Sequence, residues 1–190
     1  MVLLTARHAM TLAWWVFLVY WAIASFRVKP TAEREGWLSR LPHLLIMVGA
    51  FTLLFWDHLD LGPLDHQFVA RSPVVRWMGV ASTWVGITFA IWARVHIGQN
   101  WSSKVTLKED HQFIRSGPYS RVRHPIYSGI LLAVVGTAMV LGEWRDILGV
   151  CLVFLAHWFK AQKEEALMTR QFGSVYEEYK KQTGALIPRF

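Results

Sequence analysis

The polar residues best suited to chemistry fall into two clusters. The first lies in the run 117–129 and comprises Arg121, Arg123, His124 and Tyr127. Proline favours the first position of a helix and disfavours a helical residue before it, so we expect a helix to begin at Pro125, just after His124. The first N–H groups of a helix have no partner within it. Beside two arginines and a histidine, these groups form an arrangement that can bind an anion.

The second cluster is the glutamate pair Glu164 and Glu165. Adjacent positions on a helix diverge by about 100°, so we expect one carboxylate to face a pocket and the other to face water. Carboxylates near a lipid boundary are costly unless they are paired or solvated. Two interpretations stay open. In one, Lys160 forms a surface ion pair with Glu164; in the other, one glutamate holds a cationic or hydroxyl-rich ligand.

Composition excludes several classes of protein. The 190 residues are 54% hydrophobic and 17% charged, which excludes a disordered chain, and the one cysteine excludes an internal disulfide. The sequence lacks phosphate-binding glycine loops and a His-Glu-x-x-His motif, and its eight histidines show no metal-ligand spacing, so we predict no metal site. The net charge of +7 comes from basic residues dispersed between apolar blocks, which favours a membrane protein over a nucleic-acid partner.

Five apolar segments must position the two clusters. They span residues 9–26, 41–56, 77–93, 126–142 and 147–159. A helix that crosses the hydrocarbon layer needs about 20 mostly apolar residues, a length that these segments approach with their flanks. Only residues 143–146 separate the last two, which predicts a tight helical hairpin. We therefore predict an all-α integral membrane protein, a single domain over residues 1–190 with five transmembrane helices.

The basic residues predict the orientation of these helices. Sixteen of the 20 Lys and Arg residues follow the first, third and fifth apolar segments, so we expect the N-terminus outside and the C-terminus in the cytosol. Both clusters then lie on the cytosolic side, at the inner membrane if the source is bacterial, near anionic lipid headgroups. After the fifth segment we expect the helix to stop at Gly173 and a second helix to begin at Ser174, with Glu177 completing a capping box. The apolar stretch 185–188 is suited to fold back as part of a cofactor wall.

The sequence 123–129, R-H-P-I-Y-S-G, within the run Gly117 to Gly129, resembles the signature of the isoprenylcysteine carboxyl methyltransferase and phospholipid methyltransferase superfamily. The resemblance extends upstream to Gly98-Gln99-Asn100-Trp101-Ser102. It extends downstream to Glu164-Glu165 and Phe172-Gly173-x-x-Tyr176-x-x-Tyr179. It covers residues 75–190, so we expect a cofactor-binding core at 74–190 and a two-helix part without motifs at 1–73.

The resemblance implies a membrane enzyme that uses S-adenosylmethionine, bound at the cytosolic ends of the last helices, which would cover the pocket. The residues implied in cofactor binding are Tyr119, Arg121, His124, Pro125, Tyr127, Gly129, Glu164, Glu165 and Leu186. The substrate residues are Asn100, Trp101 and Ser102, and the catalytic candidates are Arg123, Lys163 and Glu164. A carboxylate acceptor needs a cationic clamp and no base, whereas an amine acceptor needs a base such as a glutamate.

The acceptor implied is a lipidic or prenylated molecule, above all an isoprenylcysteine-like carboxylate that becomes O-methylated. The sequence departs from the eukaryotic isoprenylcysteine enzymes, because Gln182-Thr183-Gly184 follows the basic pair where Val-Pro is usual. Lys163 and Gln162 also stand where an arginine is common. Three alternatives stay open: a phospholipid amine N-methyltransferase, an NADPH-dependent membrane reductase, and a membrane scaffold without catalytic activity.

Overall fold

A computed structural model describes residues 2–26, 37–69, 72–98 and 114–189. In this part of the chain the α-helices are α1 (Val2–Ser25), α2 (Trp37–Phe55), α3 (Pro73–Ile97), α4 (Pro125–Leu141), α5 (Trp144–Phe172) and α6 (Ser174–Gln182). Two short 3-10 helices, η1 (Gly62–Asp65) and η3 (Gly117–Ser120), join them. The prediction of an all-α protein is confirmed for these residues, in which the β-structure is limited to two isolated bridges.

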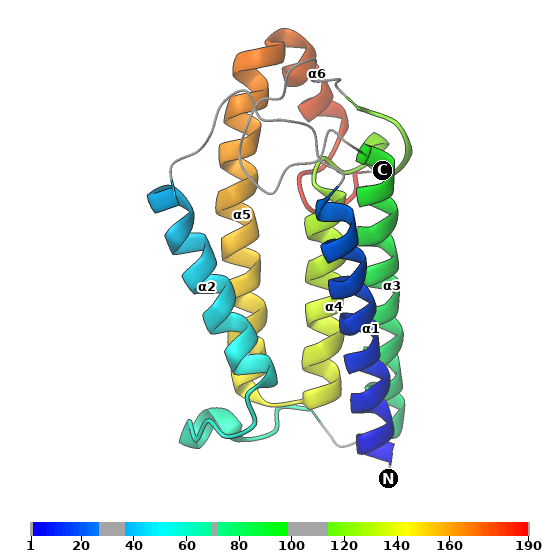
Figure 1. Cartoon of the computed structure of the whole chain (residues 1–190), viewed down its shortest axis with the longest axis vertical. Helices are drawn as coiled ribbons and strands as arrows, with labels where there is room; N and C mark the ends of the chain where they lie inside the picture. Colours follow the sequence, from blue (N-terminus) through cyan, green and yellow to red (C-terminus); the bar gives the residue numbers. More distant parts are fainter. Residues whose placement is uncertain (1, 27–36, 70–71, 99–113, 190) are drawn as a thin grey trace.

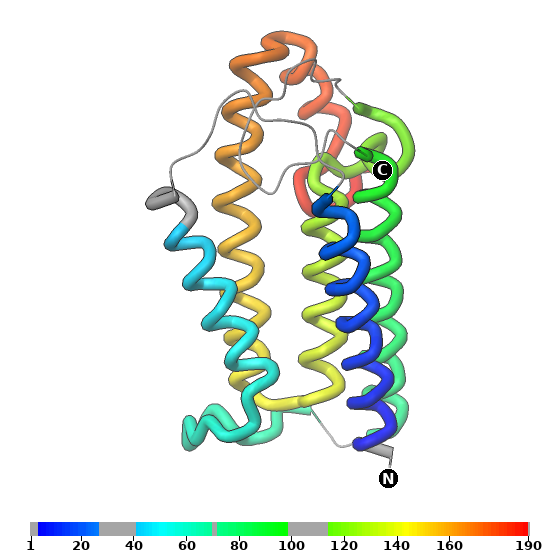
Figure 2. Tube along the Cα trace, in the orientation of Figure 1, coloured from blue at the N-terminus to red at the C-terminus, as the bar shows by residue number. Residues whose placement is uncertain are grey.

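The five long helices run up and down in alternation, so the chain crosses the length of the bundle five times (Figure 1). Helices α1, α3 and α4 pack together on one side, and α2 packs against α5 on the other. The end of α1, the start of α4 and the second half of α5 meet at one end of the bundle, where α6 and the C-terminus also lie (Figure 2). We call this the upper end, and the opposite end, which holds η1 and the N-terminus, the lower end.

Glycines bring α3 and α4 into backbone contact. A Cβ atom built on Gly129 would lie 2.5 Å from the carbonyl oxygen of Gly86, and one on Gly136 would lie 2.5 Å from that of Gly79. Each helix thus presents two glycines seven residues apart to its neighbour. Small residues at helix interfaces permit this close approach, which is typical of helices that associate within lipid. The first turn of α4 is therefore held rigidly against α3.

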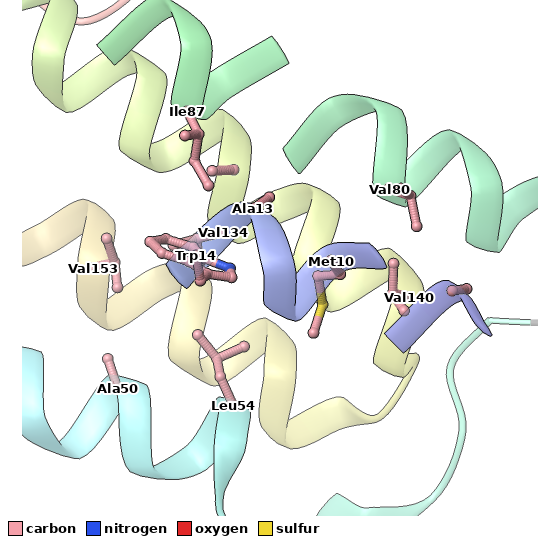
Figure 3. Close-up of a cluster of buried hydrophobic side chains, with 12 residues drawn as sticks. Met10, Ala13, Trp14, Ala50, Leu54, Val80, Ile87, Val134, Val140 and Val153 are labelled. Atoms are coloured by element: carbon pink, nitrogen blue, oxygen red, sulfur yellow. The ribbon is translucent and has the colours of Figure 1, made fainter. Parts of the chain in front are cut away.

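The central core joins both sides of the bundle (Figure 3). Trp14 of α1 donates a hydrogen bond from its indole nitrogen to Thr137 Oγ1 of α4 at 2.9 Å, which satisfies the one polar atom of a buried ring. Leu54 of α2 and Val153 of α5 are also buried in this cluster. The core fixes α4 relative to α5, the two helices that carry the predicted chemical residues.

Helices α1 and α3 are long and apolar enough to cross a membrane, while Leu41–Phe55 and α4 form shorter apolar helices. Large apolar side chains cover the outer faces, among them Trp15 of α1 and Trp77 of α3, and exposed surfaces of this kind suit a lipid environment. The tight hairpin between α4 and α5 is confirmed, with Gly142 in a left-handed conformation. The number of membrane crossings and the side on which each end lies stay predictions.

At the lower end a buried arginine ties the loop after α2 to α5. Arg145 Nε lies 2.6 Å from Glu143 Oε2 and 3.7 Å from Asp65 Oδ1, and its Nη1 donates to the carbonyl oxygen of Trp56 at 3.2 Å. Glu143 and Asp146 form a reciprocal capping box at the start of α5. This group, which we call the Arg145 hub, fastens the segment 56–65 across the end of the bundle.

Candidate active site

His124 lies at the centre of the upper end, as the residue that precedes the first turn of α4. Its ring is buried, with Nδ1 3.4 Å from Glu164 Oε2 and Nε2 3.2 Å from Glu165 Oε1. Because a carboxylate oxygen faces each ring nitrogen, the ring donates to both when it is the doubly protonated imidazolium. Burial alone would lower the pKa of His124, but the hydrogen bonds and charges of Glu164 and Glu165 outweigh it, and the pKa is raised.

The two glutamates therefore do not divide between a pocket and water as we expected. The expectation was wrong because it considered only the angle between adjacent helix positions. His124 stands directly opposite α5, and its two nitrogens lie on different edges of the ring. Two long side chains that diverge from the helix can thus converge on one imidazole. The result is a compact group of three titratable side chains, which we call the carboxylate–histidine cluster: His124, Glu164 and Glu165.

Arg123 joins this cluster to the C-terminal segment. Its Nε donates to Glu165 Oε1 at 2.7 Å, and its Nη1 donates to the carbonyl oxygens of Lys180 and Thr183 at the end of α6. Burial would raise the pKa of Glu165, but His124 and Arg123 lower it to about 2. Glu165 is thus a carboxylate at neutral pH, and the Arg123 guanidinium is occupied in holding it to α6. This geometry favours a positioning role for Arg123 over direct contact with a substrate.

Glu164 is the more accessible carboxylate, with 23% of its side chain exposed against 7% for Glu165. The Tyr127 hydroxyl donates to Glu164 Oε1 at 2.7 Å, and the Tyr127 ring lies parallel to that of His124 at 5.4 Å. Despite burial, the hydrogen bond from His124 and the positive charge of Lys160 keep the pKa of Glu164 below its usual value. Lys160 Nζ lies 5.5 Å from the centre of the Tyr127 ring. A cation, a carboxylate and an aromatic ring therefore meet where α4 and α5 face each other.

The C-terminal segment folds back along the residues that precede α4, as the sequence suggested. Arg123 N and His124 N donate to the carbonyl oxygens of Gly184 and Ala185 at 2.8 and 3.1 Å. Ser128 Oγ donates to the carbonyl oxygen of Leu186 at 2.5 Å, and the Leu186 side chain is buried. This C-terminal strap, residues 183–189, covers the start of α4 beside the carboxylate–histidine cluster. Its role as a cofactor wall stays a prediction.

The other predicted cofactor residues take different places. Pro125 is fully buried as the first residue of α4. Tyr119 is also buried: its hydroxyl donates to the carbonyl oxygen of Ala93 at 3.4 Å, and its own carbonyl accepts from the Tyr179 hydroxyl at 2.5 Å. The Arg121 side chain is exposed, so it is accessible to an anion. Gly129 faces the backbone of α3, so the structure explains this glycine by helix packing instead of cofactor contact.

The predicted substrate residues Asn100, Trp101 and Ser102 lie outside the described residues. Lys163 is exposed on α5, about 100° around the helix from Glu164. Lys160, which we considered as a surface partner of Glu164, also lies beside Tyr127. The spacing of four residues between Lys160 and Glu164 was the signal available in the sequence, because it places both side chains on one helix face.

Comparison with known proteins agrees with these motifs. The model of the isoprenylcysteine carboxyl methyltransferase (ICMT) family matches residues 79–170. Protein-S-isoprenylcysteine O-methyltransferase of Schizosaccharomyces pombe is 38% identical over 102 residues, which are 50% of this chain and 42% of that protein. Protein-S-isoprenylcysteine O-methyltransferase B of Arabidopsis thaliana is 31% identical over 153 residues, which are 72% of this chain and 77% of that protein.

A further relative and a solved structure extend the comparison. Methanethiol S-methyltransferase 2 of Bradyrhizobium diazoefficiens is 25% identical over 183 residues, which are 87% of this chain and 68% of that protein. The structure of the eukaryotic intramembrane Ras methyltransferase ICMT matches with a TM-score of 0.54 and 21% identity, over 77% of this chain and 52% of the other, and shows the shared fold. The chain spans about half the length of the S. pombe relative and of this solved protein.

Proposed function

We infer that this chain, which belongs to the isoprenylcysteine carboxyl methyltransferase family, is a membrane enzyme that transfers a methyl group from S-adenosylmethionine to a lipidic carboxylate. The observation that carries this proposal is the His124 ring between Glu164 and Glu165. Folding brings the two family motifs together at one end of the bundle. Arg123 of the first motif and Glu165 of the second are 42 residues apart in the sequence and form a hydrogen bond. The relatives named above are methyltransferases, and those of S. pombe and A. thaliana are named for isoprenylcysteine O-methylation, which supports the same reaction class.

The residues present suit the proposed cofactor. S-adenosylmethionine carries an ammonium group, ribose hydroxyls, a carboxylate and an adenine ring, and supplies an activated methyl group when bound. Glu164, as the accessible carboxylate, complements the ammonium or the hydroxyls, and the exposed Arg121 complements the carboxylate. The Tyr127 ring suits stacking or contact with a cation. Tyr119, Pro125, His124, Glu165 and Leu186 are buried and would shape the site around these contacts.

The protein's part in this reaction is positioning and charge. Methyl transfer is a direct displacement, and holding donor and acceptor in line supplies most of the acceleration. A carboxylate acceptor is already ionised at neutral pH, so it needs a nearby cation and no general base. Lys160 beside Tyr127 is the best-placed cation, with Lys163 and Arg123 as the residues suggested by sequence. The apolar bundle below the site would exclude water from the reacting groups.

The acceptor is proposed to be an isoprenylcysteine-like carboxylate, on the strength of the relatives named protein-S-isoprenylcysteine O-methyltransferase. A small thiol is the second candidate, because the methanethiol S-methyltransferase matches 87% of the chain. The two products differ chemically, since base hydrolyses a methyl ester but leaves a methyl thioether intact. A phospholipid amine would give a base-stable methylamine.

Cofactor binding is the first test. The chain, purified in detergent, is titrated in a calorimeter with S-adenosylhomocysteine and with NADPH, alongside Glu164→Ala and His124→Ala. We expect S-adenosylhomocysteine to bind and both variants to lose at least tenfold in affinity, because each loses a charge at the site. Lys181→Ala, an exposed change on α6, serves as the control and should bind as the wild type does.

The other outcomes separate the alternatives. Binding of NADPH alone would replace the methyltransferase proposal with a reductase. Binding of neither compound by protein that unfolds cooperatively would favour the scaffold. A transfer assay with methyl-labelled cofactor then compares N-acetyl-S-farnesylcysteine, methanethiol and phosphatidylethanolamine as acceptors. Base-labile label on the first acceptor is the expected result, and base-stable label on either of the others would reassign the acceptor.

A further inference from the structure

Two histidines lie inside the bundle below the proposed site. His43 is on α2 and His157 is on α5, and their ring centroids are 6.0 Å apart. His157 is 3% exposed, and His43 stands in an otherwise apolar stretch of α2. Ionisable side chains within membrane helices are rare and usually face a functional interior, because they are costly to place in hydrocarbon. Both histidines therefore require a chemical explanation.

A chain of ring contacts connects these imidazoles to the carboxylate–histidine cluster. The edge of His157 meets the Tyr127 ring with centroids 4.7 Å apart, and Tyr127 is parallel to His124 at 5.4 Å. We call His43, His157, Tyr127 and His124 the ring row. His157 precedes Glu164 by seven residues, which is about 10 Å along a helix. The ring row thus leads from the charged site toward the middle of the bundle.

The hydrogen bonding of His157 limits what it can bind. Its Nδ1 lies 2.8 Å from the carbonyl oxygen of Val153, and a carbonyl oxygen only accepts, so Nδ1 carries a proton. In the neutral ring Nε2 is then a hydrogen-bond acceptor. A group with an N–H or O–H donor suits this nitrogen, whereas a saturated hydrocarbon chain offers it nothing.

We propose that His43 and His157 recognise an acylated amino group next to the methyl-accepting carboxylate of the acceptor. This inference rests on the proposed function, in which Lys160 beside Tyr127 is the cation for the accepting carboxylate, and it adds that the hydrocarbon chain extends into the bundle. With the carboxylate beside Tyr127, an amino group on the neighbouring carbon would come close to the His157 ring, which contacts Tyr127. An acylated amino group, whose amide N–H is a donor, has the required chemistry.

The assignment gives α2 a part in choosing the acceptor. Residues 1–73 carry no family motif, and the family match begins only at residue 79. His43 nevertheless reaches the ring row, because α2 packs against α5 (Figure 1) and the His43 ring lies 6.0 Å from the His157 ring. The motif-bearing part would therefore determine the reaction, and α2 would contribute to the specificity for the acceptor.

The experiment measures acceptor kinetics with N-acetyl-S-farnesylcysteine as the probe in the full-length chain. For His43→Leu and His157→Leu we expect KM for the probe to rise about five- to tenfold, the loss of a hydrogen bond, with kcat within twofold. The Kd of S-adenosylhomocysteine should not change. His157→Asn keeps a polar group and should recover part of the lost affinity. Met47→Ala, one turn along α2 from His43, controls for looser packing between α2 and α5.

Two results would overturn the inference: a KM that stays within twofold in both histidine variants, or an equal rise in Met47→Ala. The Kd of the probe, measured with S-adenosylhomocysteine present, repeats the test without turnover. A wild-type chain that binds S-adenosylhomocysteine but shows no histidine effect disproves only the acceptor assignment. A wild-type chain that binds neither ligand disproves the proposed function and the inference with it.

Discussion

The two ends of the bundle each contain a buried arginine, and they use it differently. At the lower end, Arg145 joins the carboxylates of Glu143 and Asp65 to backbone carbonyls of the segment after α2. At the upper end, Arg123 also joins a carboxylate to backbone carbonyls, but its partner Glu165 touches His124 as well. The upper end therefore adds a titratable ring and a second, accessible carboxylate to the same kind of clamp. A buried ion pair is present at both ends, so it does not distinguish a candidate active site from a structural contact. The histidine held between two carboxylates is the feature that distinguishes the upper end.

Replacement of the two arginines should give the largest difference between the two ends, in both stability and S-adenosylhomocysteine binding. Arg123→Ala leaves the buried Glu165 without its arginine partner, so we expect a loss of about 3–5 kcal/mol in the free energy of unfolding and no measurable S-adenosylhomocysteine binding. Arg145→Ala should also destabilise the chain, by less, because Glu143 is more exposed. Denaturation in detergent and calorimetry of the folded fraction measure both effects. Loss of binding in folded Arg145→Ala would contradict the comparison.

The glycine contacts between α3 and α4 offer a second comparison. Gly129→Val and Gly136→Val each place a side chain against a backbone carbonyl, and each should cost about 1–3 kcal/mol. Gly129 lies one turn inside α4 from His124, whereas Gly136 lies toward the lower end. We therefore expect Gly129→Val to weaken S-adenosylhomocysteine binding severalfold and Gly136→Val to leave it within twofold. Thermal unfolding and calorimetry on both variants check this, and equal binding losses would refute it.

The upper end should make a pH-dependent contribution to stability through Glu165 and His124. The pKa of Glu165 is lowered to about 2, so its contribution is present above pH 4.5 and is lost as the pH falls toward 2. The pKa of His124 is raised, so its contribution is present below pH 6.5 and is lost as the pH rises through the raised value. Midpoints of thermal unfolding across this range should flatten in Glu165→Gln and keep their shape in Met47→Ala, which removes no charge. An unchanged profile in Glu165→Gln would assign the dependence to other groups.

The smallest effect is expected for an exposed pair at the lower end. Arg7 Nη2 lies 2.7 Å from Asp57 Oδ1, but the two side chains are 34% and 52% exposed. Solvent screens such a pair, so Arg7→Gln should change the free energy of unfolding by less than about 1 kcal/mol. Unfolding at low and high salt measures it. A loss comparable to that of Arg145→Ala would show that Arg7 belongs to the Arg145 hub.

Much of the fold followed from local signals in the sequence. Pro125 and Gly173 correctly predicted where α4 begins and where α5 ends, because proline and glycine act on the backbone of their own residues. The capping box at α6 was wrong: no side-chain cap is present, and Glu177 Oε1 accepts from the Thr169 hydroxyl at 3.1 Å instead. Thr169 lies on the preceding helix, so only the turn at Gly173 brings it within reach.

The site was predictable in its residues and less so in its geometry. The motifs identified His124, Glu164 and Glu165, but the contact of both glutamates with one ring depends on the distance between α4 and α5, which no spacing within one helix reveals. The tie from Arg123 to Thr183 depends in the same way on the path of the strap. The geometry of the site thus depends on packing between residues far apart in the chain, which helix periodicity does not predict.

The strap has a consequence for biosynthesis. Carbonyl oxygens of residues 183–186 hold Arg123, His124 and Ser128 in place, so the helices can enter the membrane well before the site is complete. The residues up to Leu186 must be synthesised before the strap can form its hydrogen bonds beside His124. A nascent chain would therefore remain inactive until residues 183–186, which follow the last helix, have emerged from the ribosome.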